Sequence, residues 1–167
     1  MSTFSRRQLA MCLGAFALVA CVVFWGANLG IAAQGEKPDP ELKPTFGEVK
    51  LEAGFVPDPF KKELIAGGPL FTELGGVKAF VAKPPDFKLY YKAGGLPLTI
   101  HVDSKEDTTL LINLPDGKWV AVDDSENGKN LNPVLKFEKP QSGRYDIWVG
   151  MVKKENAKAT LFITELK

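Results

Sequence analysis

Cysteine is missing from most of the chain. The 167-residue sequence has two cysteines, Cys12 and Cys21, and both lie in its N-terminal apolar stretch. The remainder therefore holds no disulfide, no thiolate metal ligand and no cysteine nucleophile. A chain of this length buries a hydrophobic core without disulfides, so their absence leaves the cellular compartment open.

Histidine is almost absent as well, since His101 is the only one. A serine protease needs a nucleophile, a histidine base and an orienting acid. No serine beyond residue 33 lies in a Gly-x-Ser-x-Gly context; the three are Ser104, Ser125 and Ser142. Strand alternation points His101 towards solvent, one histidine supplies too few ligands for a zinc hydrolase, and no carboxylate spacing indicates glycoside hydrolysis. We therefore predict no catalytic residues.

An excess of positive charge is also lacking. Arg6 and Arg7 are the only charged residues among the first 33, and without them 21 basic residues become 19, against 20 acidic residues. Binding to phosphate needs a basic face. The composition therefore predicts no nucleic-acid partner.

Long apolar runs are confined to the N-terminus. Arg6 and Arg7 precede an almost uninterrupted apolar stretch from Leu9 to Ala33, which ends on small residues. This order is typical of an export signal, so residues 1–33 are predicted to direct the chain out of the cytoplasm. The protein is then periplasmic, secreted, or anchored on the outer face of the inner membrane, and it meets the membrane only through this segment.

Three fates of this segment stay open. Cleavage near Ala33 is favoured, and Ser5-Arg6-Arg7-Gln8-Leu9 resembles the start of a twin-arginine signal. Retention as a transmembrane helix comes second, because the run is long enough to span about 30 Å of hydrocarbon. Lipidation comes third: Leu18-Val19-Ala20-Cys21 resembles a bacterial lipobox, although the residues after Cys21 stay apolar.

The remainder divides into a linker and one domain. Residues 34–45 are polar and rich in proline, which predicts an extended linker. From residue 46 to 167, short β-rich runs alternate with Gly, Pro, Asn and Asp, the pattern of an all-β sandwich. Strands are predicted at Gly47–Ala53, Lys61–Ala66, Val77–Lys83, Phe87–Tyr91, Leu96–Val102, Thr108–Leu114, Lys118–Asp123, Val134–Glu138, Gly143–Met151 and Ala157–Glu165.

Period-2 alternation selects the predicted core. Apolar side chains recur at every second position, on one face of each strand. The expected core residues are Leu110, Ile112, Leu114, Val120, Val122, Phe137, Tyr145, Ile147, Val149, Leu161 and Ile163.

The stretch from Leu96 to Glu165 resembles a known family. The segments DTTLLINLPDGKWVAVDD, LNPVLKF and SGRYDIWVG are similar to the pre-peptidase C-terminal domain, a jelly-roll-like antiparallel β-sandwich beside secreted bacterial proteases. Small exported proteins with this region alone are often labelled peptidases by association. The resemblance implies an accessory domain for binding, secretion or solubility, without an attached protease.

The acidic loop after Val122 is a candidate calcium site. Asp123, Ser125, Asn127 and Gly128 reproduce the first half of an EF-hand loop, but position twelve falls on Val134 and no helices flank it. A different site with hard oxygen ligands remains open, and some members of the resembling family bind calcium through such loops. The alternative is a solvated turn. The candidate ligands are Asp107, Asp123, Asp124, Asn127 and Asn132.

Two tryptophans form a second candidate site. Alternation directs Trp119 and Trp148 away from the predicted core, where they would stack on sugar rings unless another segment covers them. The predicted function is an exported, non-catalytic accessory or binding module, with calcium as a candidate stabilising ion. The candidate partner is an envelope protein or a glycan. A carbohydrate- or polymer-binding module is the first alternative. A secreted hydrolase is disfavoured.

Overall fold

The computed structural model describes residues 37–124 and 131–166. The chain divides after Gln34, and all described residues belong to the unit Gly35–Lys167. The predicted export segment, residues 1–33, lies outside this part. No helix between residues 37 and 166, as far as they are described, is long and apolar enough to cross a membrane.

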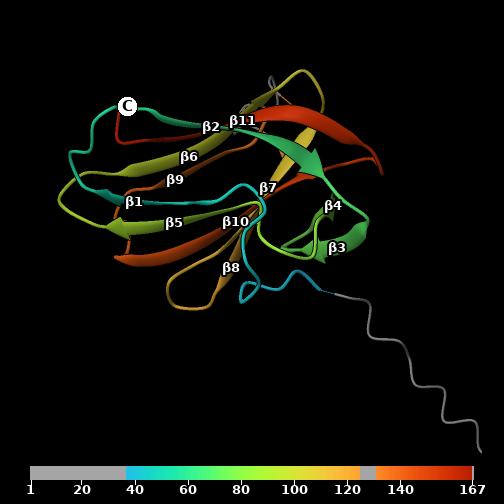
Figure 1. The fold of residues 1–167 in the computed structure, drawn as a ribbon, viewed down its shortest axis with the longest axis horizontal. Helices are drawn as coiled ribbons and strands as arrows, with labels where there is room; N and C mark the ends of the chain where they lie inside the picture. Colours follow the sequence, from blue (N-terminus) through green and yellow to red (C-terminus); the bar gives the residue numbers. More distant parts are fainter. Residues whose placement is uncertain (1–36, 125–130, 167) are drawn as a thin grey trace, which may run out of the picture. The chain divides into compact units, whose positions relative to one another are not determined.

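The described unit is built from β-strands, as predicted (Figure 1). All of them except β3 coincide with a predicted strand. The strands are β1 (Glu48–Glu52), β2 (Phe60–Gly67), β3 (Leu70–Leu74), β4 (Val77–Val81), β5 (Phe87–Lys92), β6 (Leu98–Ser104), β7 (Thr108–Asn113), β8 (Trp119–Val122), β9 (Val134–Phe137), β10 (Gly143–Met151) and β11 (Asn156–Thr164).

Strand β10 organises the first sheet. Its beginning pairs with β5, and from Asp146 to Met151 it pairs with β7, which in turn pairs with β8. The β3–β4 hairpin joins at Met151, opposite Phe80. Strand β1 lies beside β5 in parallel, the one departure from the predicted antiparallel pairing among the described strands.

The second sheet is antiparallel, with the order β2-β11-β6-β9. Its inner face packs on the inner face of the first sheet, and this arrangement is the predicted sandwich. Strand β11, the last in the chain, lies between β2 and β6 (Figure 1).

The main core confirms the alternation argument. Seven of the predicted core residues are buried in one cluster: Leu110, Ile112, Tyr145, Ile147, Val149, Leu161 and Ile163. The other four pack against that cluster while partly exposed: Leu114, Val120, Val122 and Phe137. Each fully buried aliphatic side chain stabilises the fold by about 1.5–3 kcal/mol relative to exposure.

A second, smaller cluster lies on the other face of the first sheet. Trp148 and Leu111 point outwards from β10 and β7, and they pack on Ala79 and Val81 of β4. Leu70 of the unpredicted strand β3 and Trp119 border this cluster. The β3–β4 hairpin therefore covers a face that alternation alone assigns to solvent.

The predicted linker is attached to the sandwich from residue 39 onwards. Backbone amides of Asp39 and Thr45 donate to the carbonyls of Lys83 and Pro85, at 2.8 and 2.9 Å. The Arg144 guanidinium binds the Glu41 carboxylate at 2.6 Å. Residues 40 and 41 form a turn in which the Leu42 amide donates to the Asp39 carbonyl at 3.4 Å, so this part of the segment is not the extended chain that its prolines predict. Its backbone groups bind the domain instead of leaving it free.

Candidate functional site

Three carboxylates lie close together at the open end of the β7–β8 hairpin, where β7 begins and β8 ends. Asp107 directly precedes β7, and Asp123 and Asp124 directly follow β8. Because β7 and β8 are antiparallel neighbours, the start of one lies beside the end of the other. One carboxylate oxygen from each residue lies within 4.8 Å of the other two. The structure thus brings together three of the five predicted calcium ligands.

The electrostatics of this acidic cluster favour a cation. Burial and then the charge of Asp124 raise the pKa of Asp107, although Lys153 opposes this. Burial and the charges of Asp107 and Asp124 likewise raise the pKa of Asp123. The Oδ1 atoms of Asp107 and Asp123 are buried without a hydrogen-bond partner, and no described cation forms an ion pair with the cluster.

These residues fit calcium by their chemistry. Calcium takes six to eight oxygen ligands and prefers carboxylates, backbone carbonyls and water. The acidic cluster supplies three carboxylates, and its two buried, unpartnered oxygens lack compensation for their desolvation. A divalent cation would supply that compensation.

The two asparagines predicted as calcium ligands do not belong to the acidic cluster as the structure describes it. Asn132 is buried, its Oδ1 accepts a hydrogen bond from Thr108 Oγ1 at 2.8 Å, and its Nδ2 donates to the Ser104 carbonyl at 2.8 Å. These bonds tie the loop before β9 to β6 and β7, so Asn132 has a structural role. Asn127 lies outside the described residues.

The tryptophan pair does not form an exposed platform. The Trp119 and Trp148 rings lie 4.9 Å apart with an interplanar angle of 35°, but Trp148 is 0% exposed. Trp148 points away from the main core, as alternation predicts, but another segment covers it, so its ring offers no surface for sugar stacking. The β3–β4 hairpin covers its ring, while Trp119 keeps a partly exposed edge position.

His101 stands in an aromatic stack and not beside a nucleophile. Its ring lies 4.6 Å from the Phe162 ring at an angle of 5°, on the outer face of the second sheet. Burial lowers the pKa of His101, and Asp103 opposes the shift. Of the serines in the described ranges, Ser104 Oγ bonds the Lys158 carbonyl and the Glu106 amide, and Ser142 Oγ accepts from the Ala93 amide.

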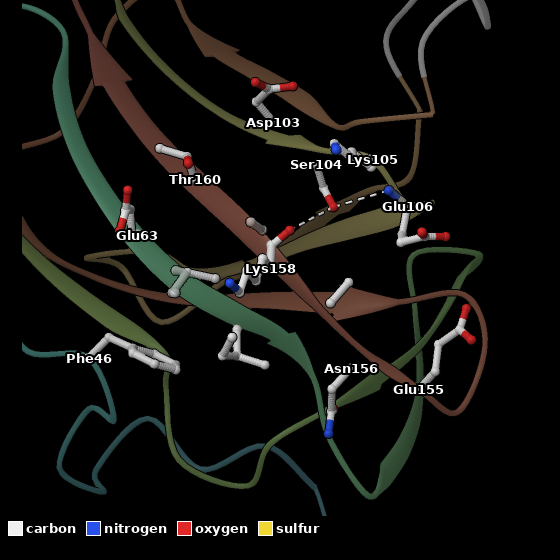
Figure 2. A pocket seen from close by; sticks show the side chains of 14 residues that line it. Phe46, Glu63, Asp103, Ser104, Lys105, Glu106, Glu155, Asn156, Lys158 and Thr160 are labelled. Atoms are coloured by element: carbon white, nitrogen blue, oxygen red, sulfur yellow. Dashed lines mark hydrogen bonds between the residues drawn. The ribbon is translucent and has the colours of Figure 1, made fainter.

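A cavity beside the outer rows of the same sheet is missing from the sequence predictions. It has a volume of about 910 Å³ and crosses β2, β11 and β6 (Figure 2). Glu63, Thr160 and Asp103 form one cross-strand row in it, because Thr160 pairs with both others. Alternation marks each as outward-facing, but the row exists only once the strand order is known.

Comparisons with known proteins add a distant structural similarity. The sequence matches no family and no curated protein at a significant level. The chain is similar to the crystal structure of PliG from Aeromonas hydrophila, described as a periplasmic lysozyme inhibitor of g-type lysozyme. The alignment covers 71% of this chain and 96% of PliG, with 14% identity and a TM-score of 0.36. Similarity at this level supports no functional conclusion.

Proposed function

We propose that this chain is an exported, non-catalytic binding module whose β-sandwich is stabilised by calcium at Asp107, Asp123 and Asp124. The observation that carries the calcium site is the convergence of three carboxylates within 4.8 Å, with two buried oxygens left unpartnered. The apolar segment 9–33 supports export, and the resemblance to the pre-peptidase C-terminal domain supports an accessory role.

Calcium would act on stability through the ends of two strands. Without it, the three nearby carboxylates repel one another, and this repulsion lowers the stability of the paired ends of β7 and β8. A cation that binds the folded state but not the unfolded chain stabilises folding by mass action, by about 2.7 kcal/mol at one hundred times its Kd.

The test is thermal unfolding of the full chain, kept in a mild detergent, with millimolar calcium and with chelator. We expect calcium to raise the unfolding midpoint. In Asp123→Asn this increase should vanish, while the midpoint in chelator stays equal or rises, because one repelling charge is gone. Asp103→Asn, an exposed carboxylate on the other sheet, is the matched control and should keep the full increase. If the unfolding midpoint of the wild type does not change at millimolar calcium, the proposed calcium site is refuted.

The rival function is a hydrolase. Against it stands the position of the single histidine, which stacks on Phe162 while Ser104 and Ser142 are bonded elsewhere. The full chain should leave casein and oligosaccharides intact. Hydrolysis that disappears in His101→Ala would overturn the non-catalytic assignment.

A further inference from the structure

The cavity over β2, β11 and β6 has the size of a ligand site. Its volume of about 910 Å³ lies near the upper end of the range, roughly 300–1,000 Å³, in which ligand pockets fall. Figure 2 shows most of its side chains on three neighbouring strands and the turns that end them, together with Phe46 from the segment before β1. A rigid, hydrogen-bonded sheet thus forms its floor.

Hydrogen-bond acceptors and donors lie in neighbouring rows of side chains along this cavity. Glu63, Thr160 and Asp103 form one row, and in the next row Lys158 pairs with Ile65 on β2. Glu106 and Glu155 stand at the turns (Figure 2). None of these carboxylates forms an ion pair with Lys158, or with any other residue in the described ranges. Charged groups of both signs therefore stand in neighbouring rows of this cavity, exposed to solvent.

This mixture selects against ligands of a single charge. A cationic ligand would meet Lys158 in the middle of the floor, and an anionic ligand would meet the surrounding carboxylates. Hydroxyl groups donate to carboxylates and accept from ammonium groups, so a polyhydroxylated ligand satisfies both rows. Ile65, which is 42% exposed, supplies an apolar contact for the C–H face of a sugar ring.

We propose that this cavity binds an oligosaccharide, whose hydroxyl groups donate hydrogen bonds to Glu63 and Asp103 and accept one from Lys158. The proposal rests on the function of a binding module and names its ligand class. The proposed sugar site on β2, β11 and β6 is separate from Trp119 and Trp148, which belong to the first sheet. The neighbouring aromatic pair offers no free ring for stacking, because His101 covers one face of Phe162 and Lys61 Nζ lies 5.2 Å from its centroid. Recognition is therefore polar.

The experiment measures binding of the full chain, in mild detergent, to four soluble probes by isothermal titration. The probes are neutral chito- and cello-oligosaccharides, a tetralysine peptide and a tetraglutamate peptide. We expect a neutral oligosaccharide to bind with little dependence on salt. Asp103→Asn and Lys158→Met should each weaken that binding at least fivefold, because each removes one partner of the hydroxyl groups. Asp123→Asn should bind sugar as the wild type does.

The variants separate this proposal from the calcium site. Asp103→Asn should lose sugar binding and keep the calcium-dependent rise in midpoint, and Asp123→Asn should do the reverse. If no neutral sugar binds at millimolar concentration, the ligand class is wrong. Salt-sensitive binding of tetralysine alone, lost in Asp103→Asn but not in Lys158→Met, would instead identify a basic peptide. Mass spectrometry should recover the sugar intact, and cleavage would contradict the non-catalytic function.

Discussion

Asp86 makes the stability of this protein depend on pH in a direction opposite to that of most acids. The side chain is 1% exposed, between β4 and β5, and its Oδ2 accepts a hydrogen bond from the Val149 amide at 2.7 Å. Burial raises the pKa of Asp86 from 3.8 to about 8, and the Val149 bond opposes this only in part. We therefore expect the folded protein to hold a proton on Asp86 at neutral pH.

The sign of the effect follows from linkage. The contribution of Asp86 to stability is fully present below its unfolded pKa of 3.8 and is lost as the pH rises through its folded pKa of about 8. Between these values folding takes up one proton, so stability falls by about 1.4 kcal/mol per pH unit. From pH 5 to pH 8 this amounts to a loss of about 4 kcal/mol.

Asp86→Asn tests this reasoning, because asparagine keeps an acceptor for the Val149 amide and cannot ionise. The free energy of unfolding of the wild type should fall about 4 kcal/mol more than that of the variant between pH 5 and pH 8. Urea titrations at pH 5, 6.5 and 8, followed by tryptophan fluorescence, measure this difference. Parallel pH profiles for the two proteins would refute a protonated Asp86. Glu48→Gln, an exposed carboxyl on β1, should run parallel to the wild type.

Two further substitutions test the packing. Gly150→Ala should destabilise the fold by about 1–3 kcal/mol, because a Cβ there would lie 2.4 Å from Thr109 Oγ1, whereas Gly95→Ala meets nothing within 4 Å and should be neutral in a urea melt. Trp148→Ala should cost about 3–5 kcal/mol in the same melt if the β3–β4 hairpin buries its ring. A cost below 1 kcal/mol would mean that this ring is exposed after all.

The main core could be predicted from the sequence because the alternation of apolar and polar residues within each strand identifies the face that is buried. Tyr145, Ile147 and Val149 needed no knowledge of their neighbours to be assigned. Trp148 needed such knowledge, since alternation says only that it leaves the main core. Its cover comes mainly from Ala79 and Val81 of β4, which is predicted as a strand, but no local pattern places that strand over β10.

The sites differ in the same way. Asp107 and Asp123 flank strands that are adjacent in sequence, so their meeting could be expected from one hairpin. The row of Glu63, Thr160 and Asp103 joins strands far apart in the chain, and it exists only because β11 inserts between β2 and β6. No local sequence pattern predicts that β11 lies between β2 and β6.

The central place of β11 also governs when the second sheet can form. Strand β2 pairs with no described strand other than β11, and β6 depends on β11 for one of its two neighbours. During synthesis β11 emerges after the other described strands, so β2 waits for its partner until residue 164 has been made. Strand β1 likewise waits for β5. Such distant pairings slow folding. The second sheet therefore cannot form before β11 is free to pair.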